Sequence, residues 1–252
     1  MCGRYIQVSS PTLLAEHFGV DENVVPETPE TREANYNVAP RADVLTIVQR
    51  GLDDPETGPE GGVRVLERMR WGLVPSWARD EKIGDRLINA RAESLAQKSA
   101  FKTAFRKRRC LIPADGFYEW QRVSGKKQKQ PMFIHRRDGE PMAFAGLWEV
   151  WRAEADAPWL LSCTIVTTRA NALMEPIHDR MPVMLPEAAW NTWLDVRTTE
   201  QAVLEPLLVP APDAEIEMWP VSTMVNSAAN NGPELVDRVE PIESETQTTL
   251  FS

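Results

Sequence analysis

The second residue of this chain is a cysteine that could carry two nucleophilic groups. The sequence opens Met1-Cys2-Gly3-Arg4, and removal of Met1 would leave an α-amine and a thiol on adjacent carbons. An α-amine has a pKa of roughly 7.7–8.0 and a thiol one of about 8.5, so both are useful nucleophiles near neutral pH. Such a residue can capture an aldehyde, because the amine forms an imine and the thiol then closes a five-membered thiazolidine. The alternative is a chance cysteine on a frayed terminus.

Four further segments combine polar residues with aromatic residues, Gly or Pro in the manner of functional loops. They are NYNVAP (35–40), RMRWGLVPSW (68–77), LINARAES (87–94) and IHDRMP (177–182). The second contains Trp71 and Trp77, the third contains Asn89 and Arg91, and the fourth packs His, Asp and Arg into one turn.

Composition indicates a globular intracellular protein without a metal site. The chain has 252 residues, of which 42% are hydrophobic and 26% charged, and shows neither a membrane span nor a signal peptide. The chain has three cysteines, Cys2, Cys110 and Cys163, and their spacing shows no pairs. This argues against a disulfide framework and indicates a protein of the reducing cytoplasm. His17, His135 and His178 are scattered, so neither a metal nor another cofactor is expected.

The charge is unevenly distributed. The formal net charge is -9, yet residues 98–137 contain twelve lysines and arginines against Asp115 and Glu119, a local charge of +10 in a chain whose remainder carries -19. Local potential matters more than net charge for binding phosphate, so this basic segment predicts contacts with nucleic acid. A solvated surface with a lysine-rich hairpin tip is the alternative.

The hydrophobic pattern predicts many strands and few helices. Ser10 and Pro11 indicate a helix start, and Gly19 its end. Further helices are expected over 92–107, after Pro186, and over 199–208. Loops are expected over 21–35, 51–62 and, as a hairpin tip, 124–130. Strands are predicted over 44–48, 63–69, 109–113, 116–121, 131–136, 142–150, 159–167, 181–185 and 215–219.

This pattern predicts an α+β fold in a single domain, built on a curved, mostly antiparallel and barrel-like β-sheet with a few short helices. The domain is expected to span residues 1–236, followed by a flexible acidic tail over 237–252.

Seven motifs, in order, resemble one known family. They are MCGR, NYNVAP, RWGLVPSW, INARAE, CLIPADGFYEW (110–120), IVTT (165–168) and IHDRMP. The chain is similar over residues 1–236 to the SRAP (SOS response-associated peptidase) family, whose members crosslink to abasic sites in single-stranded DNA.

The resemblance implies a role for each matched position. Cys2, freed of Met1, would form the thiazolidine with the ring-opened abasic sugar, and Asn89 would hold both partners. Glu119 would assist ring opening and imine formation, and His178 would assist closure and reversal. Arg4 and Arg91 would contact phosphates, Thr167 would line the pocket, and Trp71, Trp120 and Pro40 would stack on bases or interrupt their stacking.

The chemistry of the residues agrees with these roles. An abasic sugar is mostly a closed hemiacetal, so its ring oxygen must be protonated as the ring opens. Glu119 lies between aromatic residues and could have the raised pKa of a general acid, while His178 could move protons near neutral pH. Aromatic platforms in a basic groove hold a single strand without reading its sequence. The alternative is that both residues have only structural roles, Glu119 in a salt bridge and His178 in hydrogen bonds within its loop.

Three other functions compete with this one. A glutamine amidotransferase also begins with a catalytic cysteine, but this chain has no second catalytic domain. A cysteine peptidase could combine Cys2 with His178 and either Asn89 or Glu119. A DNA-binding shield would bind without turnover.

The chain ends in a pattern of its own. Gln247, Leu250 and Phe251 form Gln-x-x-Leu-Phe, which resembles the peptides that dock bacterial repair proteins on the sliding clamp. A chance ending or a tail folded back on the domain is the alternative. The expected partners are therefore single-stranded DNA with abasic sites and the sliding clamp. The protein is expected to be a monomer and to lie in the cytoplasm, associated with the nucleoid.

Overall fold

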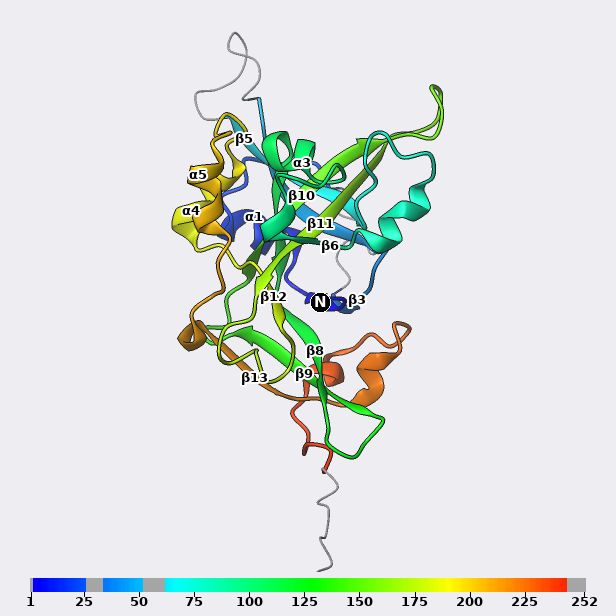
Figure 1. Ribbon diagram of the computed structural model, residues 1–252, viewed down its shortest axis with the longest axis vertical. Coiled ribbons are helices and arrows are strands. Elements are labelled where there is room, and N and C mark those ends of the chain that lie inside the picture. The colour runs from blue at the N-terminus through cyan, green and yellow to red at the C-terminus, as the bar shows by residue number, and fades with distance from the viewer. Residues whose placement is uncertain (1, 26–33, 52–61, 244–252) are drawn as a thin grey trace, which may run out of the picture.

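The computed structural model describes residues 2–25, 34–51 and 62–243 and contains two β-sheets (Figure 1). The smaller sheet has the strand order β13(Ile216–Pro220), β9(Lys129–Arg136), β8(Gly116–Arg122), β1(Tyr5–Gln7), β3(Asn35–Val38). The larger has the order β12(Arg180–Pro182), β11(Leu160–Arg169), β10(Met142–Trp151), β7(Arg109–Ala114), β4(Asp43–Arg50), β5(Val63–Trp71), β2(Glu22–Asn23), with β6(Asn89–Arg91) also paired to β11.

The larger sheet closes on itself. Strand β11 pairs antiparallel with β10 and parallel with β5, where Ser162 lies opposite Arg70 and Cys163 opposite Trp71. The pairings β11–β10–β7–β4–β5–β11 therefore form a closed ring, in which every pair except β5–β11 is antiparallel. The predicted α+β, barrel-like and mostly antiparallel fold is confirmed.

Both faces of the barrel strands are buried, and alternate residues serve different cores. On β4, Val44 and Val48 belong to one cluster with Trp71 and Ile165, whereas Leu45 and Ile47 belong to another. Successive side chains of a strand point to opposite faces, so the first cluster occupies one face and the second packs beneath helices on the other. The run of apolar residues at 44–48 follows from this double burial.

The α-helices are short: α1(Pro11–His17), α3(Lys102–Lys107), α4(Glu187–Leu194) and α5(Gln201–Leu204). The described residues also form 3-10 turns: η1(Glu81–Arg86), η2(Ala92–Ser94), η3(Glu205–Leu207), η4(Asp213–Glu215), η5(Thr223–Asn226) and η6(Pro233–Val236). The predicted start of α1 is confirmed, because Ser10 caps it by accepting the Leu13 N–H at 3.2 Å and Pro11 follows.

Two helix predictions were too long. The segment 92–107 contains only η2 and α3, and its apolar periodicity arises because Leu95, Phe101 and Phe105 all reach the same core from a turn and a helix. The segment 199–208 divides into α5 and η3 at Pro206, whose ring lacks an N–H and cannot continue an α-helix. The strand predicted over 181–185 is β12 followed by a single bridge between Met184 and Phe144.

The predicted loops have mixed outcomes. The segment 21–35 includes β2 and the first residue of β3, and residues 26–33 lie outside the described ranges, as do residues 52–61 of the other acidic loop. The loop after β8 is shorter than predicted because β9 begins at Lys129.

Candidate functional site

Cys2 lies at the junction of the two sheets. It precedes β1, which pairs with both β3 and β8, and its side chain is fully buried. Burial raises the pKa of the Cys2 thiol well above its usual range, and the negative charge of Glu119 raises it further. The Cys2 thiol in this environment is therefore neutral at physiological pH.

Asn89 fixes the backbone of Cys2. Its Nδ2 donates to the Cys2 carbonyl oxygen at 2.8 Å, and it lies on β6, opposite Ile165 of β11. Its Oδ1 is buried and has no hydrogen-bond partner among the described residues. Because buried polar atoms are nearly always paired, an amide oxygen left in this state indicates a ligand or water contact.

Thr167 presents a second atom of the same kind. It lies two residues beyond Ile165 on β11, and therefore on the same face of the strand. The Thr167 side chain is fully buried, and its Oγ1 has no hydrogen-bond partner in the described part of the chain. Asn89 and Thr167 thus supply two unpaired polar atoms on neighbouring strands.

Glu119 belongs to the smaller sheet, on the strand that pairs with β1 after Cys2. It lies on β8, pairs with Met132 of β9 in the ladder, and is 3% exposed. The Tyr118 N–H donates to the Arg4 carbonyl oxygen at 3.0 Å, so β8 runs beside the residues that follow Cys2. The Glu119 charge contributes to the raised pKa of the Cys2 thiol, after burial.

His178 lies in the connection between β11 and β12. Its Nδ1 accepts the Arg180 backbone N–H at 3.0 Å and also lies 2.8 Å from the Asp179 carboxylate. One nitrogen cannot accept from an N–H and donate to a carboxylate at once, so the two contacts belong to different protonation states. Asp179 is highly exposed, and we take the backbone hydrogen bond as the resting contact. His178 lines a pocket of about 270 Å³ with Trp120, Arg122 and Lys129.

The two predicted phosphate contacts differ in their surroundings. Arg4 donates to Asn37 Oδ1 at 2.8 Å and to the Val225 carbonyl at 2.9 Å, and partial burial lowers the pKa of its guanidinium. It therefore ties β1 to the segment at Val225 as well as reaching the surface. Arg91 is exposed on β6, two residues after Asn89.

Arg180 was missed in the sequence reasoning although it belongs to the IHDRMP motif. It donates to both carboxylate oxygens of Glu93, at 2.7 and 3.0 Å, and to the Thr167 carbonyl at 2.6 Å. Together with its backbone contact to His178, these bonds connect β11, β12 and η2. The arginine two residues after the predicted histidine was the available signal.

The structure corrects the assignment of Trp71 as a stacking surface. Its side chain is fully buried, packs against Tyr5 at 5.1 Å between ring centroids, and donates its indole N–H to the Ile88 carbonyl at 2.9 Å. No ring face remains for a base. The exposed aromatic residue of that motif is Trp77, which is 56% exposed. Trp120 and Pro40 are partly exposed, and Trp120 donates to Asn226 Oδ1 at 2.7 Å.

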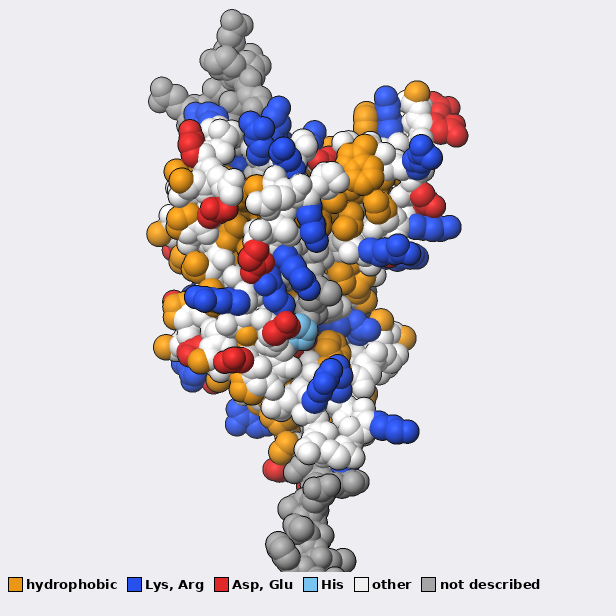
Figure 2. Space-filling model, in the orientation of Figure 1, with side chains coloured by type: hydrophobic (Ala, Val, Ile, Leu, Met, Phe, Trp, Pro, Cys, Tyr) orange, Lys and Arg blue, Asp and Glu red, His pale blue; other side chains and the backbone are white. Residues whose placement is uncertain are grey.

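The basic segment 98–137 does not form one continuous surface. Its helix α3 lies near one end of the molecule and the β8–β9 hairpin near the other (Figure 1). Arg109 is 1% exposed and donates to backbone carbonyls, among them Trp193 at 2.5 Å and Phe105 at 2.7 Å, so it holds helix ends together. Figure 2 shows Lys and Arg side chains along the face between the barrel and the smaller sheet.

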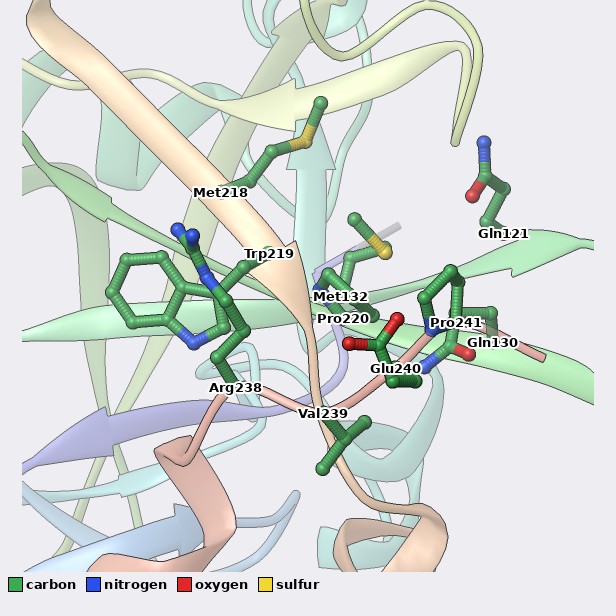
Figure 3. A pocket seen from close by; sticks show the side chains of 10 residues that line it. All are labelled: Gln121, Gln130, Met132, Met218, Trp219, Pro220, Arg238, Val239, Glu240 and Pro241. Atoms are coloured by element: carbon green, nitrogen blue, oxygen red, sulfur yellow. The ribbon is translucent and has the colours of Figure 1, made fainter.

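Residues 237–243, the described part of the predicted tail, are mostly exposed but make backbone hydrogen bonds to the domain. Val239 N–H donates to the Pro220 carbonyl at 3.0 Å, and Ile242 N–H to Gln130 Oε1 at 2.8 Å. Figure 3 shows Arg238 beside Trp219 in a pocket of about 680 Å³ between this segment and β13, which none of the predicted site residues lines. Gln247, Leu250 and Phe251 lie outside the described residues.

Comparison with known proteins identifies the family. The family model described as SOS response associated peptidase (SRAP) matches residues 1–228. The chain belongs to this family. It is 43% identical over 237 residues to the abasic site processing protein YoqW of Bacillus subtilis (strain 168), covering 94% of this chain and 99% of that protein. It is 32% identical over 229 residues to the abasic site processing protein HMCES of Mus musculus, covering 79% of this chain and 64% of HMCES.

Solved structures show the same fold. A protein from Bacteroides thetaiotaomicron superposes with a TM-score of 0.80 at 22% identity, covering 95% of this chain and 100% of that one. A phage-related protein from Bordetella bronchiseptica gives a TM-score of 0.63 at 31% identity, covering 87% of this chain and 94% of that one. No helix in the described residues is long and apolar enough to cross a membrane.

Proposed function

We propose that this protein captures abasic sites in single-stranded DNA through Cys2. The observation that carries the proposal is the setting of Cys2, which is buried, held at its carbonyl by Asn89 and influenced by the Glu119 charge. The unpaired Asn89 Oδ1 and Thr167 Oγ1 offer hydrogen bonds to the hydroxyls of a sugar. The names of the relatives, as abasic site processing proteins, support the same substrate.

The reaction requires removal of Met1 and then two bond-forming steps. Glu119 protonates the ring oxygen as the abasic hemiacetal opens, and the α-amine of Cys2 adds to the aldehyde and loses one water to give an imine. The Cys2 sulfur then adds to the imine carbon, and the thiol proton ends on the nitrogen. The product is a thiazolidine, formed from protein and aldehyde with loss of one water.

Burial of the thiol explains why a general base is needed in the second step. Since the pKa of the Cys2 thiol is raised, the thiol must give up its proton as the carbon–sulfur bond forms. The Glu119 charge raises the pKa of this thiol, and His178 lines a pocket with Trp120, the residue that follows Glu119 on β8. We assign proton transfer at the ring oxygen during opening and at the thiol to Glu119, and proton transfer at the nitrogen during closure and reversal to His178.

The strand on either side of the lesion is held by charge and stacking. Arg4 and Arg91 bind phosphates near Cys2, and Arg122 and Lys129 extend the positive charge beside His178. Trp120, Pro40 and Trp77 offer exposed or partly exposed surface to the neighbouring bases, which suits binding without sequence preference.

Peptide hydrolysis is less well supported by this site. A cysteine peptidase needs a thiolate, whose pKa is lowered by a neighbouring histidine or another positive group. Here burial and the Glu119 carboxylate both raise the pKa of the Cys2 thiol. These two effects disfavour the resting thiolate that peptide hydrolysis needs, whereas in aldehyde capture the α-amine reacts first and the thiol loses its proton only as the carbon–sulfur bond forms.

We also propose the replication sliding clamp as a protein partner, on the sequence pattern alone. Leu250 and Phe251 would fill an apolar pocket, and Gln247 would hydrogen-bond at its edge. A peptide of residues 243–252 should bind the host clamp with a dissociation constant on the order of micromolar, and Leu250→Ala with Phe251→Ala should remove binding while leaving crosslinking intact. Absence of binding by calorimetry at high clamp concentration would refute this partner.

One experiment tests the proposed function. The protein is incubated with single-stranded DNA carrying one abasic site, and adducts are resolved on a denaturing gel. The wild type should give a heat- and detergent-stable adduct, whereas Cys2→Ala should give none and should still bind the DNA. An adduct formed by Cys2→Ala at the wild-type rate and yield would contradict the proposal.

A further inference from the structure

Two exposed tryptophans stand out from the remaining seven. All nine tryptophans lie in the described ranges, and only Trp77 and Trp159 are exposed, at 56% and 60%. Such large apolar side chains usually lie in a core or interface, so their exposure on a monomer indicates a contact surface. Trp77 belongs to a motif shared with the family, but Trp159 lies in none of the seven motifs.

The two tryptophans belong to one region of the surface. Trp151 pairs with Leu160 at the end of the β10–β11 hairpin and donates its indole N–H to the Ala78 carbonyl at 2.8 Å. Nearby, the Val74 N–H donates to Ser162 Oγ at 2.8 Å. The segments that carry Trp77 and Trp159 are therefore joined side by side, and Figure 2 shows hydrophobic side chains grouped below the hairpin tip, with Lys and Arg side chains around them.

Trp159 is half of an arginine–aromatic stack. The Arg152 guanidinium carbon lies 4.2 Å from the centroid of the Trp159 ring, and Arg152 Nη1 donates to the Ala155 carbonyl at 2.7 Å. The same turn carries Glu154 and Asp156, both exposed. In Figure 2, acidic side chains lie on the outer edge of the hairpin tip, and a group of hydrophobic side chains lies below the tip. A cation stacked on an indole is a suitable platform for a nucleobase and its phosphate.

The platform lies within reach of a strand bound at the proposed site. Thr167 lies seven positions after Leu160 on β11, and a rise of about 3.3 Å per residue makes this about 23 Å. Sites for single-stranded nucleic acid commonly cover about 4–16 nucleotides. A strand with its abasic sugar beside Thr167 can therefore continue past Trp77 to Trp159.

We propose that Trp159 and Arg152 form a second stacking platform, which binds unpaired bases of the same DNA strand several nucleotides from the lesion. This inference rests on the proposed function. The platform would add affinity and would favour lesions flanked by single-stranded DNA on one side, without taking part in the chemistry.

The test uses oligonucleotides that carry a stable abasic analogue. One has two nucleotides on each side of the lesion, and two others are extended to eight nucleotides on one side only. Wild-type affinity should increase with one of the two extensions. Trp159→Ala should reduce affinity for that extended strand by about 5- to 150-fold, the range for loss of one stacked base. Binding of the short strand should not change, nor should the rate of crosslinking to a strand of the same length that carries a true abasic site.

Two further variants separate stacking from apolar contact. Trp159→Tyr should keep most of the affinity, while Trp159→Leu should lose as much as Trp159→Ala, because leucine keeps apolar area but has no ring. Arg152→Ala should flatten the log–log salt dependence for the extended strand by about 0.7. Leu13→Ala is the matched control, since Leu13 is 46% exposed on α1, and it should change neither strand.

The possible failures are distinguishable. If the wild type neither binds nor crosslinks any abasic strand, the proposed function fails. If the wild type crosslinks but Trp159→Ala binds both extended strands as tightly as the wild type, the second platform is refuted, and the patch belongs to a protein contact.

Discussion

At the scale of residues, burial decides which side chains can perform which step. Cys2 and Glu119 are both removed from water at the junction of two sheets, so the thiol keeps its proton until a neighbouring group takes it. His178 is more exposed and takes one hydrogen bond from the backbone, so it can exchange protons with solvent. This contrast assigns the two groups to different steps.

Glu119→Gln and His178→Ala should therefore affect the two directions of reaction differently. Loss of a positioned acid or base costs about 10²- to 10⁴-fold in rate. Glu119→Gln should mainly slow adduct formation, because ring opening comes first. His178→Ala should mainly slow release, measured as transfer of the protein to a competing abasic strand. Equal effects of each variant on both rates would refute the division of roles.

Residue types and motif order were enough to nominate Cys2, Asn89, Glu119 and Thr167. Asn89 and Thr167 lie on the paired strands β6 and β11, Asn89 donates to the Cys2 carbonyl, and Glu119 lies on β8 of the smaller sheet. Residue types and motif order were not enough to show which tryptophan is exposed and could stack on a base. Trp71 and Trp77 belong to the same motif, and only the pairing of Trp71 with Cys163 at the barrel seam shows that Trp71 is internal. Exposure depends on tertiary contacts that no local pattern contains.

At the scale of elements, one close glycine contact folds the loop that carries Trp77 and leads to Asn89. A Cβ at Gly84 would lie 2.5 Å from the Gly72 carbonyl oxygen, and one at Gly72 would lie 2.8 Å from the Gly84 carbonyl oxygen. Gly72 also has a φ of +129°, which favours glycine. The backbone of η1 can therefore approach the end of β5 only because both positions lack a side chain.

Gly84→Ala should destabilise the protein by about 1–3 kcal/mol, the usual cost of overpacking, and should slow adduct formation by displacing Asn89. Chemical denaturation and the crosslinking time course measure the two effects. Gly139→Ala is the control, because it has a positive φ but no atom within 4 Å of the added Cβ. It should cost about 1–2 kcal/mol through backbone strain and leave crosslinking unchanged. Full crosslinking by Gly84→Ala would show that this contact does not position the site.

The strands were more predictable than the helices for a physical reason. Barrel strands such as β4 and β7 are buried on both faces, and this gives a strong continuous apolar signal. The short helices bury one face through only one or two turns, so turn residues such as Leu95 imitate helical periodicity. The long predicted helices therefore separated into shorter pieces.

At the scale of the whole molecule, sequence distance and spatial distance disagree. The basic segment 98–137 is continuous in sequence, yet α3 and the β8–β9 hairpin lie apart (Figure 1). Conversely, the site collects residues from β6, β8 and β11 and from the chain before β1. The parallel β5–β11 pair that closes the barrel joins residues more than ninety positions apart, and no local signal marks it.

The three buried thiols should make stability fall at alkaline pH. Burial raises the pKa of Cys2, Cys110 and Cys163, whereas an unfolded thiol titrates near about 8.5. Above that pH the unfolded chain releases protons that the folded chain retains, so the free energy of unfolding decreases by about 1.4 kcal/mol per pH unit per thiol. Below it, the thiols should contribute no slope.

Cys163→Ala tests this contribution. The variant is expected to be less stable at every pH because of the cavity it creates, but its stability should decline less steeply above pH about 8.5, measured by urea denaturation. Variants at Cys2 and Cys110 should reduce the slope similarly. A decline as steep in all three variants as in the wild type would show that other groups cause it.

The central claim is that both reacting atoms belong to residue 2, and intact mass spectrometry of the adduct tests it most directly. Three proteins are compared: the protein freed of Met1, Cys2→Ser, and a variant with one glycine inserted before Cys2. The first should give an adduct equal to protein plus abasic DNA minus one water, stable without a reducing agent. Cys2→Ser should give an adduct only when borohydride traps its imine, and the inserted glycine should prevent the stable adduct. A stable adduct of Cys2→Ser without reductant, or of the glycine variant at the wild-type yield, would contradict the account.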